Sequence, residues 1–242
     1  MRVFTKSDIG LTRSSNQDYC MSGEFPDGAV WAVVCDGMGG ANGGSTASRV
    51  AVENIAESLK SGYSEELTPE EIRNLMMLSV EYANRAVYDM SVHVPTLSGM
   101  GTTVVCAIVK KKRAHIVHAG DSRAYICGDE GIRQVTTDHS VVQQLVDMGE
   151  LTKEQARNHP KRNLITRALG TEQSLRTDYN TVEFEDGAAL VLCTDGMSNY
   201  FSDDTLLEYV RRYDGDELTA RLVEHSKELG GSDNITVAVI SE

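Results

Sequence analysis

The sequence has little positive charge: 23 Lys and Arg residues face 36 Asp and Glu residues, which gives a formal net charge of −13. A protein that binds nucleic acid needs a basic patch or stripe, and the sequence contains none, so we predict no nucleic-acid partner. Long hydrophobic runs are also missing. No stretch approaches the roughly 20 apolar residues of a membrane helix, and the first residues lack the apolar core of a signal peptide. We therefore expect no membrane span and a cytoplasmic location.

Paired cysteines are missing as well. Five cysteines are present, and no two have the C-x-x-C spacing of a zinc or redox site. All lie in or beside apolar runs, which is typical of reduced thiols in a reducing compartment. They are Cys20, Cys35, Cys106, Cys127 and Cys193.

Two further patterns resemble a catalytic motif and a metal-binding pair, but we assign neither function to them. Cys127 and Arg133 have the C-x5-R spacing of cysteine-dependent phosphatases, but two acidic residues between them would repel phosphate and raise the pKa of the thiol. We interpret this segment as a hairpin. His115 and His118 are three residues apart on an expected strand, so their side chains should point to opposite faces.

Alternation of short apolar segments and turn residues predicts the elements of the fold. We find no repeat, low-complexity tract or linker, and we expect one domain over residues 1–242. Successive strands without room for helices between them favour antiparallel pairing, and the fold class is therefore α+β, with sheets covered by helix pairs. The expected strands are 2–10, 18–22, 29–37, 102–110, 113–121, 122–130, 131–137, 178–185, 188–195 and 234–241, and the expected helices are 45–59, 69–90, 203–212 and 215–229.

Residues 139–170 differ from the rest of the chain. They are polar and contain two short helical pieces with a proline between them. We interpret them as an excursion on the surface and call them the flap segment.

Carboxylates occur repeatedly at the ends of apolar strands. Asp36, Asp121 and Asp195 come at or after the end of such a run, and Asp18 and Asp233 come just before one. If these strand ends meet at one edge, the carboxylates crowd together and raise each other's pKa. A hard divalent cation relieves this repulsion, and ligands that are all oxygen favour Mg²⁺ or Mn²⁺ over zinc.

The simpler interpretation of any one of these sites is a turn, because Asp-Gly after a strand is a common turn sequence. Asp129 and Asp186 are examples to which we assign no function. The metal hypothesis depends on recurrence and on the buried character of the strands.

Eight short motifs follow one another along nearly the whole chain. They are RSSNQD (13–18), DGMGG (36–40), GMGTTVV (99–105), HAGDSRAY (118–125), TTDHS (136–140), ITRALG (165–170), CTDGMSN (193–199) and GGSDNITVAVI (230–240). In order and spacing they resemble the motifs of the metal-dependent protein phosphatases of the PPM group, also called type 2C Ser/Thr phosphatases, in their compact bacterial form.

The resemblance implies a four-layer α/β/β/α sandwich of two antiparallel sheets, with a binuclear Mg²⁺ or Mn²⁺ centre where the sheets meet. By position, Asp36 would bridge both ions and the carbonyl of Gly37 would bind the second. Asp195 and Asp233 would hold the first ion, and Asp18 would contact metal-bound water.

The resemblance also implies a third, weaker ion near Asp121 and a phosphate-binding role for Arg13. A metal-activated water would hydrolyse phosphoserine and phosphothreonine in proteins without a phosphoenzyme. An arginine suits this position, since its planar fork matches phosphate oxygens. The flap segment corresponds to a mobile flap beside the active site of the family.

Three positions depart from the family. Met38 stands where eukaryotic relatives have a histidine that is assigned as the general acid. Ala41 replaces a common histidine of bacterial members, and Ser45 replaces a common glutamate. We predict that these changes alter substrate preference or rate and leave metal binding intact.

The expected partners are phosphoproteins, including a cognate Ser/Thr kinase that the enzyme would oppose, and we expect a monomer. Two alternatives differ from this. An inactive scaffold would bind partners without turnover, but such relatives typically lose metal ligands and this chain keeps them. A phosphatase dedicated to one regulatory protein, such as an antagonist of an anti-sigma factor, usually carries a sensor domain.

Overall fold

The third strand, β3 (Val30–Met38), is apolar on both of its faces, and this determines its place in the fold. The computed structural model describes residues 1–40 and 43–242. Successive side chains of a strand point to opposite sides. On β3, Val30, Ala32 and Val34 lie in one buried cluster, while Trp31, Val33 and Cys35 lie in another. A sheet that is buried on both faces must form an inner layer.

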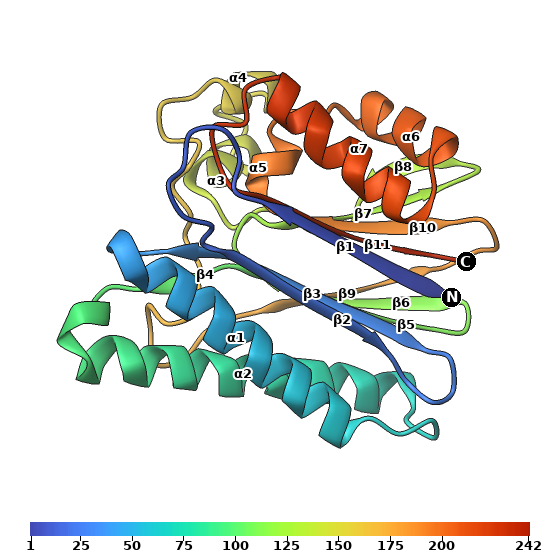
Figure 1. Cartoon of the computed structure of the whole chain (residues 1–242), viewed down its shortest axis with the longest axis horizontal. Helices are drawn as coiled ribbons and strands as arrows, with labels where there is room; N and C mark the ends of the chain where they lie inside the picture. The colour runs from blue at the N-terminus through green and yellow to red at the C-terminus, as the bar shows by residue number, and fades with distance from the viewer.

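Two antiparallel sheets form the inner layers (Figure 1). One has the strand order β1-β11-β10-β7-β8, and the other has the order β2-β3-β5-β6-β9, with the short β4 paired to β3. The remaining strands are β1 (Arg2–Asp8), β2 (Asp18–Glu24), β4 (Gly101–Thr102), β5 (Val104–Lys110), β6 (Arg113–Ala119), β7 (Arg123–Gly128), β8 (Gly131–Gln134), β9 (Asp178–Glu183), β10 (Ala189–Cys193) and β11 (Ile235–Ser241).

Helices cover the outer face of each sheet (Figure 1). Two long helices lie on the sheet that contains β3, and three shorter ones lie on the other sheet. They are α1 (Gly40–Gly62) and α2 (Pro69–His93) on one side, and α5 (Asp195–Ser198), α6 (Asp203–Arg212) and α7 (Gly215–Glu228) on the other.

Three apolar clusters fill the three spaces between the four layers. One joins α1 and α2 to the inner sheet and contains Trp31, Ile55 and Met76. The second lies between the sheets, and the third joins the other sheet to α6 and α7. The expected α+β class with two antiparallel sheets and helices on both sides is therefore confirmed.

The differences from the predicted elements lie at their ends. The α1 helix begins at Gly40, five residues before its expected start at 45, so the glycine-rich turn is shorter than its composition indicates. The β3 strand continues through Asp36 to Met38. The four-residue α5 was not predicted, because one turn is too short for a helical pattern. Ala41, one of the departures from the family, lies outside the described residues.

The flap segment leaves the fold and returns to it at neighbouring positions. It contains α3 (Val141–Asp147) and α4 (Lys153–Arg157). Ser140 forms an isolated β-bridge with Ile165, and the amide of Thr166 donates to the carbonyl of His139 at 2.7 Å. Two adjacent stretches of backbone thus form the base of the flap segment.

Three smaller predictions hold. Cys127 and Arg133 lie on the two strands of the β7–β8 hairpin, and burial raises the pKa of the Cys127 thiol to about 12, which makes it a poor nucleophile. His115 and His118 alternate with Ile116 and Val117, which belong to different clusters, so the two histidines face opposite sides. No described helix is long and apolar enough to cross a membrane.

Candidate active site

The strand ends from both sheets deliver aspartates to one place. Asp18 opens β2 and lies directly opposite Asp36 of β3 in the antiparallel register. Asp195 begins α5, two residues after β10, and Asp233 lies two residues before β11. Since β2 and β3 belong to one sheet and β10 and β11 to the other, this aspartate cluster bridges the two inner layers.

The remaining predicted carboxylate, Asp121, lies in the turn between β6 and β7. These two strands belong to different sheets, so the turn crosses from one inner layer to the other. Asp36 and Asp195 both interact electrostatically with Asp121. All five predicted carboxylates are therefore brought together.

Burial and mutual repulsion make this cluster electrostatically unfavourable. Burial, followed by the charge of Asp18, raises the pKa of Asp36 well above its ordinary value. Burial raises the pKa of Asp18 to about 7, against hydrogen bonds from Thr236 and Thr194 that lower it. Burial and then the charge of Asp195 raise the pKa of Asp121 to about 7. These carboxylates therefore form a buried anionic cluster whose charged forms a bound cation would stabilise.

Two oxygen atoms of the cluster confirm this. The Oδ1 atoms of Asp18 and Asp195 are buried and have no hydrogen-bond partner among the described residues. Their Oδ2 atoms accept hydrogen bonds from Thr194 at 2.9 Å and from Asn199 at 3.2 Å. Buried carboxylate oxygens without a partner are costly, and they are the ligands that hard divalent cations prefer. The residues present fit a Mg²⁺ or Mn²⁺ site.

Arg13 lies at the edge of the cluster and pairs with one of its members. Its terminal nitrogen donates to Oδ2 of Asp233 at 2.7 Å. The arginine side chain is 51% exposed and the aspartate side chain 33%. The hydrogen bond to Asp233 is the main cause that raises the pKa of Arg13. The predicted phosphate ligand and a predicted metal ligand therefore contact each other directly.

Glycines allow the backbone segments of the site to approach closely. A Cβ atom on Gly37 would lie 2.1 Å from the carbonyl oxygen of Gly44 and 2.5 Å from that of Gln17. A Cβ atom on Gly196, next to Asp195, would lie 1.9 Å from the carbonyl oxygen of Asn234. Only glycine fits at either place.

Asn234 is a positioning residue that the sequence did not single out. Its Oδ1 accepts from the amide of Gln17 at 2.8 Å, and its Nδ2 donates to the carbonyls of Ile9 and Ser15 at 2.9 and 3.0 Å. It thereby fixes the loop that carries Arg13 to the residues around Asp233. Its place in the motif GGSDN was the available signal, but nothing local shows which backbone groups it binds.

A cavity of about 540 Å³ opens beside the cluster, between the aspartates and the flap segment. Asp121, Asp195 and Asp233 line one part of it, and Lys153, Arg157 and Arg162 of the flap segment line another.

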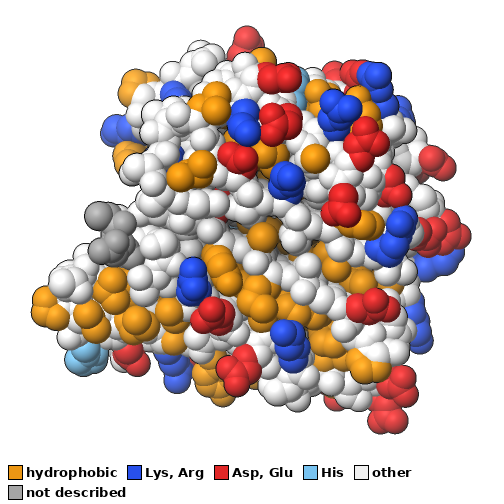
Figure 2. All heavy atoms as spheres, viewed as in Figure 1, with side chains coloured by type: hydrophobic (Ala, Val, Ile, Leu, Met, Phe, Trp, Pro, Cys, Tyr) orange, Lys and Arg blue, Asp and Glu red, His pale blue; other side chains and the backbone are white. Residues whose placement is uncertain are grey.

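Figure 2 shows acidic and basic side chains interspersed over the upper layers of this view, with apolar side chains gathered along the layer of α1 and α2. No basic stripe is present on this face.

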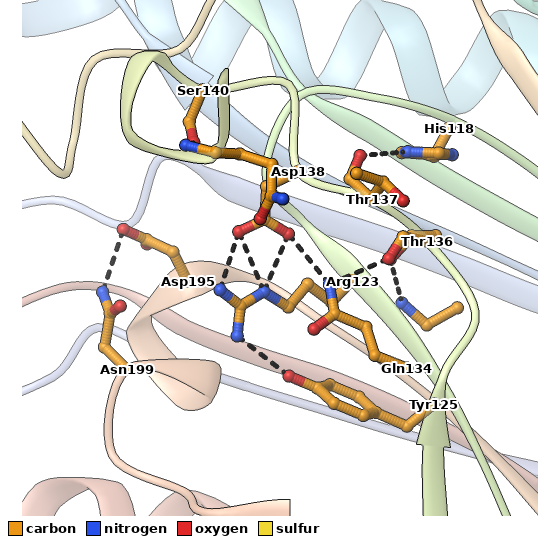
Figure 3. A network of polar contacts seen from close by, with 12 residues as sticks. His118, Arg123, Tyr125, Gln134, Thr136, Thr137, Asp138, Ser140, Asp195 and Asn199 are labelled. Carbon is orange, nitrogen blue, oxygen red and sulfur yellow. Dashed lines mark hydrogen bonds and ion pairs between the residues drawn. The ribbon is translucent and has the colours of Figure 1, made fainter. Parts of the chain in front are cut away.

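A polar network supports the wall of the cavity (Figure 3). The guanidinium of Arg123 binds Asp138 through three contacts of 2.7 to 3.1 Å, and its NH1 donates to the hydroxyl of Tyr125 at 3.0 Å. In the same view Asp195 lies beside this pair and accepts from Asn199. The sequence assigned no role to Arg123 or Asp138.

Fold and site together define a class of protein: a four-layer sandwich with a carboxylate cluster, suited to hard divalent cations, between its two sheets. Comparison with known proteins identifies the family within this class. The sequence model of the protein phosphatase 2C family matches residues 12–229. The chain is 34% identical over 241 residues to the serine/threonine phosphatase Stp of Listeria monocytogenes, which covers 99% of this chain and 95% of that protein.

Other relatives agree. Protein phosphatase PhpP of Streptococcus pneumoniae is 32% identical over 242 residues, which covers 100% of this chain and 97% of that protein. The solved serine/threonine phosphatase of S. agalactiae superposes with a TM-score of 0.92 at 32% identity, covering 100% of this chain and 99% of that one. The catalytic domain of PstP, solved with two manganese ions, superposes with a TM-score of 0.85 at 33% identity, covering 98% and 96%.

The chain belongs to the protein phosphatase 2C family. It is a protein-serine/threonine phosphatase of the bacterial type, and its family is metal-dependent. The resemblance found in the sequence is thereby confirmed. The individual roles of Arg13, Gly37 and the five aspartates stay predictions, which the geometry above supports.

Proposed function

We propose that the aspartate cluster binds two Mn²⁺ or Mg²⁺ ions and that a third binds near Asp121. Asp36, Asp195 and Asp233, with the carbonyl of Gly37, would hold the first two, and Asp18 would act through water. The observation that carries this proposal is the convergence of five carboxylates, of which Asp18, Asp36, Asp121 and Asp195 have raised pKa values and two have a buried oxygen without a partner. Bound cations supply the Lewis-acid chemistry that acidifies water and stabilises charge on the phosphoryl oxygens.

Arg13 would bind the substrate phosphate. In this structure it donates to Asp233, so it already lies within one side-chain length of the cluster. A cation on Asp233 would compete for the same carboxylate and leave the guanidinium fork for phosphate oxygens. Binding by a fork rather than a point charge would orient the phosphoryl group.

The general acid is not a side chain at position 38. Met38 carries no ionisable group, and its Cε lies close to Gly101, so this side chain fills space. We propose that Met38, Ala41 and Ser45 affect rate or substrate preference and not metal binding.

The flap segment would influence the choice of substrate. Lys153, Arg157 and Arg162 line the cavity and form no ion pair with any described residue. In a chain with a net charge of −13, these cations would lower the local repulsion of an anionic phosphoprotein.

We also propose that residues 1–242 form one domain that acts as a cytoplasmic monomer and opposes a Ser/Thr kinase of the same cell. The three apolar clusters together join all four layers, which supports a single domain. All five cysteines are unpaired thiols, which supports a reducing compartment. An inactive scaffold is disfavoured, because every predicted cation ligand is present and in the cluster.

Chelation and one matched pair of variants test the chemistry. We expect hydrolysis of an aryl phosphate and of a phosphothreonine peptide to stop in EDTA and to return with excess Mn²⁺. Asp195→Ala should abolish the Mn²⁺-dependent rate. Asp186→Ala removes an exposed aspartate of the β9–β10 turn, which pairs with Lys112, and should leave the rate unchanged. Activity that survives chelation, or an active Asp195→Ala variant, contradicts the proposal.

A further inference from the structure

The turn that carries Asp121 is held on both sides by two consecutive residues of another segment. On one side, the amide of Gly120 donates to Nδ1 of His139 at 3.2 Å, and the amide of His139 donates back to the carbonyl of Gly120 at 2.9 Å. Only glycine suits position 120, because its φ is +109° and a Cβ there would lie 2.6 Å from Thr103. His139 thus fixes the peptide group that precedes Asp121.

On the other side, Asp138 holds Arg123, two residues after Asp121. The two side chains are 11% and 25% exposed. Nε of Arg123 donates to both carboxylate oxygens at 2.9 and 3.1 Å, and Gln134 adds a hydrogen bond to Asp138 at 3.0 Å. Figure 3 shows Asp138 and Arg123 at the centre of this network. A buried, bidentate pair of this kind is geometrically specific.

His139 is also the first residue of the flap segment, and Asp138 comes directly before it. The carbonyl of His139 accepts from the amide of Thr166 at 2.7 Å, at the far end of the segment. Nε2 of His139 contacts Asp178 at 3.2 Å, and Arg167 donates to that same aspartate at 2.9 Å. His139 therefore touches the Asp121 turn through one ring nitrogen and the exit of the flap segment through the other.

A metal site is the obvious alternative for His118, His139 and Asp178, whose ligand atoms lie within 4.8 Å of one another. Two observations oppose it. The rings of His118 and His139 are stacked, with centroids 4.6 Å apart and planes only 13° from parallel. Ring lone pairs lie in the ring plane, so two parallel rings do not converge on one ion. NH1 of Arg167 also lies 2.9 Å from both His139 and Asp178, where its charge repels a cation.

The contacts of His118 indicate a packing role for its ring instead of metal binding. Nε2 of His118 contacts the carbonyl of Thr137 at 2.9 Å, and its ring lies flat against His139. The His118 ring is only 1% exposed. It thereby limits the positions that the His139 ring can take.

We propose that Asp138 and His139 are positioning residues, which fix the Asp121 carboxylate at the metal site and tie it to the base of the flap segment. This inference rests on the proposed role of Asp121 in cation binding. Outer partners that orient a metal ligand typically contribute a factor of about 10 to 100 in metal affinity. Displacement of the flap segment and cation binding at Asp121 would then be coupled through one pair of neighbouring residues.

Calorimetric titration with Mn²⁺ tests the proposal, with the rate of aryl-phosphate hydrolysis measured in parallel. In His139→Ala we expect the weakest Mn²⁺ binding step to lose about tenfold in affinity, with the tighter steps unchanged. In His139→Asn the amide oxygen replaces Nδ1 as the acceptor for Gly120, and we expect the affinity to recover. His115→Ala is the matched control. His115 is as buried as His118 and bonds Tyr179, so this variant loses stability without a change in Mn²⁺ binding.

A second set of variants covers the case in which His139→Ala does not fold. Asp138→Asn keeps the shape and removes the charge that holds Arg123, and we expect faster hydrogen exchange at residues 120–122 together with weaker Mn²⁺ binding. Asp121→Asn should remove the weakest step, and adding Asp138→Asn to it should cause no further loss.

Two results overturn the inference: Mn²⁺ affinities of His139→Ala and Asp138→Asn that match those of His115→Ala, or a loss in Asp138→Asn that adds to that of Asp121→Asn. A wild-type protein that binds no Mn²⁺ would overturn the proposed function itself. The two failures are therefore distinguishable.

Discussion

At the scale of the residue, the aspartates that would bind cations also lower the stability of the folded protein. Asp18, Asp36, Asp121 and Asp195 all have a raised pKa, chiefly through burial, so each destabilises the protein when it is ionised without a cation. The pair between Arg13 and Asp233 neutralises one further carboxylate only. The residues that would bind cations are therefore the ones that the metal-free protein tolerates least.

Replacement of Arg13 tests its proposed contact with phosphate. We expect Arg13→Lys to lower kcat/KM for a phosphothreonine peptide about 10- to 100-fold, since loss of a hydrogen bond to a charged group costs about 1.5–3 kcal/mol. Inhibition by inorganic phosphate should weaken in parallel. Arg85→Lys, in an exposed pair on α2, is the control for a general effect of the substitution. An Arg13→Lys variant with normal phosphate inhibition would refute the assignment.

The pH dependence of stability without metal tests the raised pKa values. The pKa of Asp18 is about 7 in the folded protein, above its ordinary value, so the native state binds more protons than the unfolded state and stability falls as the pH rises toward and through 7. The buried His115, with its pKa lowered to about 4, has the opposite effect, which is complete above about pH 6.5.

The effect of Asp18 on stability is therefore best measured between pH 6.5 and 8, where the effect of His115 no longer changes. In EDTA we expect the urea midpoint of the wild type to fall across this window and that of Asp18→Asn to fall less. A wild-type midpoint that rises, or two parallel profiles, would contradict the electrostatic account. Saturating Mn²⁺ should flatten the wild-type profile.

At the scale of the element, close contact between β3 and the start of α1 positions the site. The carbonyl of Gly44 and that of Gln17 both lie against Gly37, which pairs with Thr102 of β4. Three segments thus meet at a residue without a side chain. This close packing, which only glycine allows, holds the strand end that carries Asp36.

Gly37→Ala should be strongly destabilising. The added Cβ would lie 2.1 Å and 2.5 Å from two backbone oxygens, which cannot rotate away, and we expect a loss of about 3 kcal/mol or more in the free energy of unfolding. Gly128→Ala, where the nearest atom lies 4.0 Å away, should change it by less than about 1 kcal/mol. Urea unfolding of the two variants measures the difference, and equal midpoints would show that this contact is unimportant.

At the scale of the whole molecule, the proposed cation site between two sheets would act as a link between layers. Asp18 and Asp36 come from one sheet, and Asp195 and Asp233 flank strands of the other. The central apolar cluster joins these sheets elsewhere. Cation binding should therefore stabilise the molecule as well as activate it.

Calorimetry measures this linkage. At 100 times its Kd, a cation that binds only the folded state adds about 2.7 kcal/mol, which corresponds to a rise in Tm of about 5–10 °C for a domain of this size. We expect this rise with Mn²⁺ for the wild type and for Asp186→Ala, and no rise for Asp36→Asn. A Tm that does not depend on Mn²⁺ would exclude a cation between the sheets.

Much of this protein was predictable from its sequence, because the relevant signals are local. Alternating or continuous apolar residues defined the strands such as β3 and β10, and helical spacing defined α2, whose predicted first residue, Pro69, is its observed one. The recurrence of aspartates at strand ends indicated a hard-cation site before any relationship was considered. Each of these signals lies within about ten neighbouring residues, where backbone geometry and burial leave few choices.

The tertiary structure alone decided which distant groups meet. It placed Asn234 against Gln17, Arg13 against Asp233, and His139 against Gly120. It also showed that Asp138 forms an ion pair with Arg123 and that α1 begins within the glycine run. Contacts of this kind join segments up to 220 residues apart, and their partners are selected by the packing of four layers, which no short stretch of the sequence encodes.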